Sequence, residues 1–158
     1  MKKKIIIFGK KSFIGLNLYN FLKKKHLVKI KNFSLKNLKD INSYNYIINC
    51  STNLKYVYSK YNIKNDFDIK IVKKIKNSNT KYIFLQTRKI YKPKSNIKEN
   101  STKLCKKNYE KNKLITEKKI IETLKKQAVI LRISNFIGLD FNNSKKVHRT
   151  YMDYFLKN

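Results

Sequence analysis

The sequence predicts an α/β protein built on a doubly wound parallel sheet, and three observations lead to this fold class. Short apolar runs alternate along the chain with segments whose apolar residues recur at helical spacing. Most of the runs are nearly continuous, as expected for strands covered on both faces. The chain also contains only three glycines, and two of them lie just after the first apolar run.

The first predicted strand, residues 5–8, leads into a turn bracketed by Gly9 and Gly15. Glycine permits the tight turn that a chain needs after a strand. A helix is predicted to follow, with Ser12 as its N-cap. Its apolar face comprises Ile14, Leu18, Phe21 and Leu22. The N-terminus of such a helix favours an anion such as a pyrophosphate at the turn, and an ordinary strand-to-helix connection fits the turn equally well.

Further strands and helices alternate along the rest of the chain. Four more strands are predicted at residues 27–30, 46–48, 82–85 and 128–131. One helix is expected to be opened by Asn65 and Asp66, with an apolar face made of Phe67, Ile71 and Ile75. A longer helix, rich in Lys and Glu, is expected to present Leu114, Ile121 and Leu124. Pro93 lies in the polar segment 92–107, which is typical of a surface loop.

The chain is strongly basic, with 39 Lys and Arg against 9 Asp and Glu and a formal net charge of +30. Such an excess attracts phosphorylated ligands and can indicate a nucleic-acid partner. Only three of the cations are arginine, however, and the lysines are scattered through every segment. This distribution favours codon bias over a dedicated polyanion surface, so a nucleic-acid partner is not expected.

Composition also bounds the compartment and the cofactor chemistry. No apolar run approaches the length needed to span a bilayer, and residues 5–8 are too short for a signal-peptide core, so we expect no membrane association and a cytoplasmic protein. Cys50 and Cys105 are far apart in the sequence and fit no metal-ligand spacing. We therefore expect two free thiols and no metal site.

Polar residues follow the predicted strands at the positions where open α/β sheets bind ligands. Cys50 and Ser51 come after the third strand, and Thr87 comes after the fourth. Tyr109 and Lys113 are four residues apart, so they share one face of a helix, and an ammonium beside a tyrosine favours its phenolate. In a chain this rich in Lys and Tyr, such a pair is by itself more often solvated surface.

Taken together, the motifs resemble those of the extended short-chain dehydrogenase/reductase family, the NAD(P)-dependent sugar-nucleotide epimerases, dehydratases and reductases. The likeness runs from about Lys3 to Gly138. The family's G-x-x-G-F-I-G turn is similar to residues 9–15, with Ser12 in place of the middle glycine. The S-x-x-V-Y stretch resembles residues 87–91, the Y-x-x-x-K motif resembles residues 109–113, and L-R-x-x-N-x-x-G resembles residues 131–138.

The resemblance implies a Rossmann-type domain over residues 1–140 that binds NAD(P) and acts on a nucleotide-linked sugar. It implies that Tyr109 is the general acid/base, that Lys113 holds the nicotinamide ribose and tunes Tyr109, and that Thr87 binds the reacting oxygen. Asn135 would contact the nucleotide-sugar, and Asp40 with Ile41 the adenine. The full set of implied cofactor contacts is Gly9, Ser12, Phe13, Ile14, Gly15, Asp40, Ile41, Cys50, Ser51, Tyr109 and Lys113.

Departures from the family pattern sharpen these expectations. No acidic residue ends the second strand, where Lys29, Lys31 and Asn32 stand instead, which favours NADP over NAD. Family members are much longer than this chain. We therefore expect most of the C-terminal substrate lobe to be missing, with residues 141–158 as its remnant. Two other classes stay open: a truncated, non-catalytic nucleotide-binding paralogue and, less favoured, a basic nucleic-acid-binding protein. A homodimer is also left open.

Overall fold

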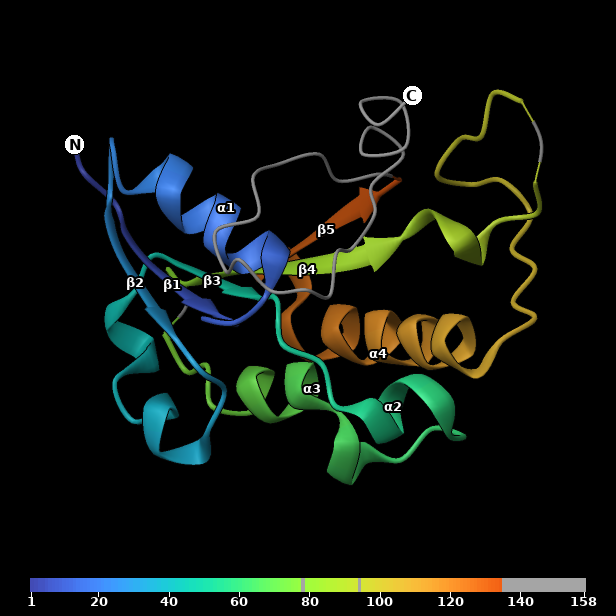
Figure 1. Ribbon diagram of the computed structural model, residues 1–158, viewed down its shortest axis with the longest axis horizontal. Helices are drawn as coiled ribbons and strands as arrows, with labels where there is room; N and C mark the ends of the chain where they lie inside the picture. The colour runs from blue at the N-terminus through green and yellow to red at the C-terminus, as the bar shows by residue number, and fades with distance from the viewer. Residues whose placement is uncertain (78, 94, 135–158) are drawn as a thin grey trace, which may run out of the picture.

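A computed structural model describes residues 1–77, 79–93 and 95–134 (Figure 1). Five strands form one all-parallel sheet in the order β2-β1-β3-β4-β5. Their bounds are β1 Lys4–Phe8, β2 Leu27–Lys31, β3 Tyr46–Asn49, β4 Lys81–Thr87 and β5 Ala128–Ile133. Each contains one of the predicted apolar runs, and the doubly wound parallel sheet predicted from the sequence is confirmed.

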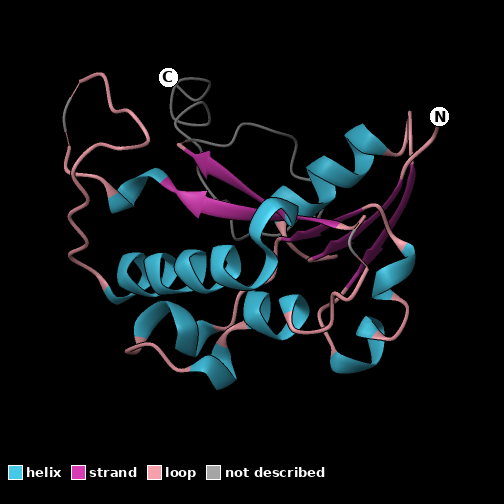
Figure 2. Cartoon of the chain, turned by 180° about the vertical axis from the view of Figure 1, so that it is seen from behind, coloured by secondary structure: helices cyan, strands magenta, loops and turns pink. Residues whose placement is uncertain are grey.

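Helices cover both faces of the sheet, which therefore forms the middle of three layers (Figures 1 and 2). The helix α1, Phe13–Leu22, lies on one face. The helices on the other face are α2 Leu54–Tyr58, α3 Phe67–Val72 and α4 Asn108–Leu124. Short 3-10 turns occupy Leu35–Leu38, Ile41–Ser43, Ile63–Asn65, Arg88–Ile90 and Lys125–Gln127.

The two faces of the sheet carry separate apolar clusters, because side chains alternate between the faces along each strand. Ile5 and Ile7 point toward α1, where Leu18 and Leu22 pack against them. Their chain neighbours Ile6 and Phe8 point to the other face. There they join a larger cluster that includes Ile47, Ile69, Ile71, Tyr82, Phe84, Ile120 and Leu124. The larger of the two clusters therefore lies on the face that α3 and α4 cover.

The turn after β1 has the geometry that its glycines suggested. Gly9 adopts φ +123°, a left-handed conformation that favours glycine, and its N–H donates to the carbonyl of Lys31 at 2.8 Å. The Ser12 side chain accepts a hydrogen bond from the N–H of Gly15 at 3.3 Å, which confirms it as the N-cap of α1. A Cβ on Gly15 would stand 2.4 Å from the carbonyl oxygen of Gly9, so this position has no room for a side chain.

Three details of the helices differ from the sequence-based expectation. Phe21 was assigned to the buried face of α1, yet 70% of it is exposed, because it lies past the edge of the apolar stripe. The helix α3 ends at Val72, so Ile75 lies beyond it and only packs against the core. On α4, Ile121 was expected to be buried and is 46% exposed, because this helix buries mainly polar residues.

The strand β2 forms one edge of the described sheet. It pairs only with β1, with Ile6 opposite Lys29 and Phe8 opposite Lys31. Leu27 and Lys29 are exposed along it. This edge of the sheet thus carries two lysines, Lys29 and Lys31, at alternate positions of β2.

Replacement of Gly15 by alanine should destabilise the fold. The new methyl group would collide with the Gly9 carbonyl, and overpacking of this kind typically costs about 2 kcal/mol of the free energy of unfolding. Phe21→Ala is the matched control in the same helix, and it should change the free energy of unfolding by less than about 0.5 kcal/mol because its ring is exposed. Urea denaturation followed by circular dichroism measures both, and equal losses would contradict this account of the turn.

Candidate functional site

The ends of β1 and β3 meet where the sheet changes winding direction, since α1 covers one face and α2 and α3 the other (Figure 1). The carboxyl ends of the strands at such a switch point are where doubly wound sheets bind their ligands. The backbone there is closely packed: the Cys50 N–H donates to the carbonyl of Phe8 at 2.7 Å. A Cβ on Gly9 would lie 3.0 Å from both the carbonyl carbon and the Cβ of Cys50. The glycine turn and residue 50 therefore form one surface.

Most of the cofactor residues implied by the motifs lie at this edge. Gly9, Ser12, Phe13, Ile14 and Gly15 form the turn and the first turn of α1, and Cys50 touches them. Ser51 follows, with its N–H donating to the Asn49 side chain at 3.0 Å. The N-terminus of a ten-residue helix at the end of a central strand suits a negatively charged group.

Asp40 and Ile41 are not brought to this edge. They precede β3, and the neighbouring Asn42 bonds the backbone of Lys74 and Lys76 in the connection that leads into β4. This connection lies at the opposite, amino end of the strands. Ile41 is fully buried in the core, so its side chain has no surface to offer an adenine. The structure therefore gives no support to these two residues as adenine contacts.

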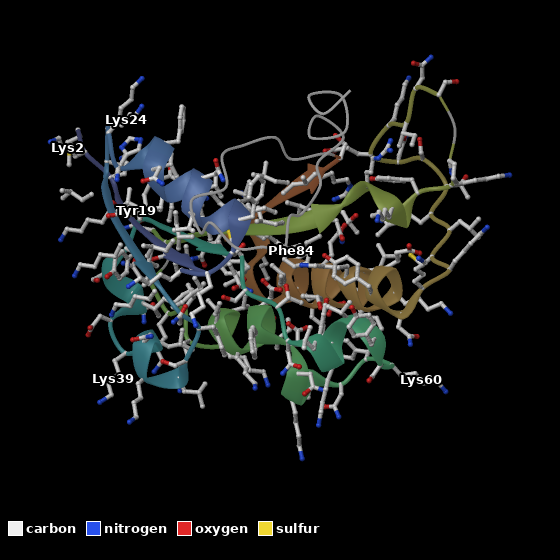
Figure 3. The ribbon with its side chains drawn as sticks, viewed as in Figure 1. Lys2, Tyr19, Lys24, Lys39, Lys60 and Phe84 are labelled. Carbon is white, nitrogen blue, oxygen red and sulfur yellow. The ribbon has the colours of Figure 1, made fainter. Side chains whose placement is uncertain are left out.

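Lys113 lies buried beneath the carboxyl end of β4. Only 5% of the residue is exposed, and its Nζ donates to the carbonyl of Leu85 at 3.1 Å. The same ammonium stands 4.3 Å from the centre of the Phe84 ring, which Figure 3 labels in the middle of the molecule, and 6.0 Å from the centre of the Tyr109 ring. A lysine is rarely buried without a partner, so its surroundings define the site.

The partner of Lys113 is Asp68, a residue that the sequence analysis did not single out. Its Oδ2 lies 3.7 Å from the Lys113 Nζ. Its Oδ1 accepts hydrogen bonds from the Asn49 amide at 2.9 Å and from the Tyr82 hydroxyl at 2.5 Å. Burial and the nearby Asp68 charge raise the pKa of Tyr82 well above its usual value, so this phenol stays protonated as a donor. In the sequence, Asp68 appears only as an ordinary acid in the first turn of a helix.

A second buried network joins β4, β5 and α4. The Gln86 amide donates to Glu117 at 2.5 Å and to the carbonyl of Lys113 at 3.1 Å. Arg132 pairs with Glu117 at 2.9 Å and donates to the Tyr91 hydroxyl. This network fixes α4 against the two strands, so it also fixes where Lys113 stands.

Thr87 and Tyr109 lie on β4 and α4, the two elements that the Lys113 side chain joins. Thr87 ends β4, two residues after the carbonyl that Lys113 contacts, and its hydroxyl accepts from the Lys89 N–H at 3.2 Å. Tyr109 lies in the first turn of α4, half-buried, with its ring edge-to-face against Tyr56 at 6.5 Å. Asn135 lies outside the described residues, as do Gly138 and the segment 141–158.

The Cys50 thiol is also part of this edge. Burial raises its pKa to about 12, the Asp68 carboxylate adds to the rise, and Lys113 opposes it. The thiol is therefore protonated at neutral pH, which makes it a poor nucleophile. Cys50 serves as a small side chain that allows the glycine turn to approach.

Two cavities lie beside the site, in the segment between β4 and α4. The first has a volume of about 340 Å³ and is lined by Arg88, Lys89, Tyr91, Pro93, Ile97, Leu104, Lys106, Lys107 and Glu110. The second, of about 370 Å³, is lined by Arg88, Tyr91, Asn96, Ile97, Lys98, Glu99, Arg132 and Ser134. Both are set back from the glycine turn, next to Thr87 and Tyr109 in the chain.

The described part of the chain contains neither a cluster of metal-ligand residues nor a helix suited to span a membrane. Over residues 1–77, 79–93 and 95–134, no three His, Cys, Asp or Glu side chains cluster as metal ligands would. Within the same ranges, no helix combines the length and the apolar character of a membrane span.

Comparison with known proteins identifies the fold. No family model matches the chain, and no curated protein matches its sequence. Solved structures do match: dTDP-4-dehydrorhamnose reductase from Bacillus anthracis in complex with NADP has a TM-score of 0.69 at 16% identity. The L780 UDP-rhamnose synthase of Acanthamoeba polyphaga mimivirus matches with a TM-score of 0.63 at 15% sequence identity. UDP-N-acetylglucosamine 4-epimerase from Bacillus cereus matches with a TM-score of 0.62 at 16% identity.

The matches cover 90%, 85% and 83% of this chain, in that order, but only 57%, 56% and 52% of the matched proteins. The chain thus spans little more than half the length of these sugar-nucleotide enzymes. The comparison confirms the Rossmann-type fold, and the matched proteins are of the kind that the sequence motifs resemble.

Removal of the Asp68 charge should destabilise the protein. Asp68→Asn keeps the shape but leaves the Lys113 ammonium buried without its counter-charge, which we expect to cost about 3 kcal/mol of the free energy of unfolding. Glu122→Gln is the matched control, because it breaks the exposed pair with Lys118 and should cost well under 1 kcal/mol.

Denaturant unfolding of both variants checks this prediction. A double variant, Asp68→Asn with Lys113→Met, should recover much of the loss, because the unpaired cation is then gone. If Asp68→Asn is as mild as Glu122→Gln, the pair does not hold α3 to α4 as described.

Proposed function

We propose that this chain binds NAD(P)H at the carboxyl edge of its sheet and acts as an oxidoreductase or epimerase on a nucleotide-linked sugar. The observation that supports this most is the position of Lys113. It lies four residues after Tyr109, under the end of β4, and close enough to Cys50 to influence its thiol. Cys50 in turn touches the glycine turn. The glycine turn, Cys50, the end of β4 and the Tyr109–Lys113 pair therefore adjoin one another, and this arrangement supports the proposal.

The residues at this edge fit a dinucleotide. The first turn of α1 would hold the pyrophosphate, and Cys50 and Ser51 would border the bound chain. One N–H of the Lys113 ammonium donates to Leu85 and one faces Asp68, so a third remains for a ribose hydroxyl as far as the described residues are concerned. When bound, the nicotinamide supplies or accepts the hydride.

The proton chemistry would fall to Tyr109 and Thr87. Tyr109 would give its phenolic proton to the substrate oxygen or take one from it, and the Thr87 hydroxyl would donate a hydrogen bond to the same oxygen. The Lys113 ammonium lies 6.0 Å from the centre of the Tyr109 ring, on the helix face that the two residues share. Asp68 would keep the ammonium in place through its bonds to β3 and β4.

The end of β2 supports a preference for NADP. Lys31 closes this strand, and its carbonyl accepts from the N–H groups of Gly9 and Lys10, so it adjoins the glycine turn. No acidic side chain is present there to bond a ribose 2′-hydroxyl, and the lysines favour a 2′-phosphate.

Titration with both cofactors tests the binding proposal. We expect NADPH to bind at least as tightly as NADH in calorimetry at physiological salt, because the lysines at the end of β2 attract the 2′-phosphate. Lys31→Glu should shift the ratio of affinities toward NADH. Lys39→Glu, an equal charge change at an exposed site beyond the turn, should leave the ratio unchanged. Absence of binding of either cofactor would refute the proposal.

Turnover tests the catalytic part. Tyr109→Phe should lower the rate by about 10²–10⁴ while the affinity for NADPH stays within about twofold, because only the proton donor is lost. Tyr58→Phe, which alters an exposed tyrosine on α2, is the control and should leave the rate unchanged. Assays would pair each cofactor with a panel of nucleotide-sugars.

The outcome separates the remaining classes. Binding of NADPH without turnover of any sugar would favour a non-catalytic, nucleotide-binding protein. Binding of RNA alone, lost as salt is raised, would favour a basic nucleic-acid binder, for which the net charge of +30 is the supporting observation.

A further inference from the structure

The two cavities between β4 and α4 share part of their walls. Arg88, Tyr91 and Ile97 line both of them, so they adjoin around one arginine. Arginine is rare in this chain: three residues of 158, where lysine supplies nearly all of the positive charge. Two of the three, Arg88 and Arg132, line the second cavity. A scattered cationic surface does not explain this concentration.

The two arginines have different surroundings. Arg132 is held by Glu117 and Tyr91, so its guanidinium is fixed in place. Arg88 is exposed, and its guanidinium makes no hydrogen bond or ion pair with any residue in the described part of the chain. A planar guanidinium with unused donors is suited to a phosphate, which it can bind through two parallel hydrogen bonds.

The walls combine positive charge with an apolar surface. Arg88, Lys89, Lys106 and Lys107 line the first cavity against a single carboxylate, Glu110. That carboxylate is already engaged, since it accepts from the backbone N–H groups of Lys106 at 2.8 Å and Lys107 at 3.0 Å. The remaining lining residues are largely apolar: Tyr91, Pro93, Ile97 and Leu104. Such a site suits an organic anion better than a bare ion.

The position of the cavities links them to the proposed chemistry. Arg88 follows Thr87 directly in the chain, and Glu110 follows Tyr109. Neither Thr87 nor Tyr109 lines a cavity, but each is the chain neighbour of a lining residue, so a ligand that extends beyond the cavities along β4 and α4 would approach the two proposed catalytic hydroxyls. Each cavity is also of a size typical for small-molecule sites, which run from about 300 Å³ upward.

We propose that these adjoining cavities bind the diphosphate and the attached sugar of the substrate, with Arg88 as the residue that selects a phosphate-bearing ligand. This inference rests on the proposed function, because it takes the substrate to be a nucleotide-sugar. Arg88 binds a phosphate through its fork, the neighbouring lysines add charge, and Ile97 with Leu104 contacts the carbon skeleton. Arg132, anchored by Glu117, forms the fixed wall of the second cavity.

Calorimetry on the full chain at physiological salt tests the proposal with UDP-glucose, UDP and inorganic pyrophosphate as probes. Arg88→Gln should weaken UDP-glucose binding about tenfold or more, since charge-assisted hydrogen bonds are lost. Arg88→Lys should restore only part of the affinity, because an ammonium lacks the fork. Lys39→Gln removes one exposed charge at the far edge of the molecule (Figure 3) and should change the affinity less than twofold.

Three results would overturn the proposal: no binding of UDP-glucose to the wild type, equal losses in Arg88→Gln and Lys39→Gln, or pyrophosphate binding as tightly as UDP-glucose. Parallel titration with NADPH keeps this test distinct from that of the proposed function. Arg88→Gln should leave NADPH affinity within twofold. If the wild type does not bind NADPH but binds UDP-glucose in a manner that depends on Arg88, the proposed oxidoreductase function is refuted and the proposed substrate site is not.

Discussion

A carboxylate removed from water must find its partners inside the protein, and Asp68 is where this constraint shapes the molecule. Its two oxygens meet Asn49 on β3, Tyr82 on β4 and Lys113 on α4. Desolvation of the two charges costs several kcal/mol for each ion, so the arrangement is stable only with all of these partners in place. Asp68 therefore ties α3 and α4 to the two central strands β3 and β4.

A second carboxylate in the same turn strengthens this coupling. Asp66 caps α3 through the Ile69 N–H at 3.1 Å and accepts from the Thr116 hydroxyl on α4 at 2.6 Å. Burial raises the pKa of Asp66, and the Asp68 charge adds to the rise. Two acids in the first turn of α3, two residues apart, thus hold α3 to α4 by polar contacts, and the apolar core completes the packing around them.

The parts of this structure that the sequence predicts are those governed by local rules. The strands are short apolar runs. The turn after β1 requires residues without a side chain at positions 9 and 15, and the sequence has glycine at both. The buried face of α4 breaks the rule that apolar residues point inward. This face buries the polar residues Lys113, Thr116 and Glu117, because each has a polar partner on another element. The apolar Ile121 is exposed.

The candidate site divides in the same way. The spacing of Tyr109 and Lys113 is local, so their shared face could be predicted from the sequence. Asp68 could not, because it is 45 positions from Lys113 and nothing in the sequence marks the two as partners. Asp40 and Ile41 are adenine contacts by the family resemblance alone, and the fold carries them to the other end of the strands. Tertiary pairing, absent from any local pattern, decides both cases.

The edge strand β2 gives the abundant lysines one role that needs no ligand. Among the described strands β2 pairs only with β1, and an edge of this kind presents backbone groups that invite strand addition from another molecule. Lys29 and Lys31 stand along this edge, so an approaching copy would meet like charges before it could form hydrogen bonds. The composition that biased codons would produce would therefore also oppose strand addition at this edge, and chemical neutralisation of these amines would remove that opposition.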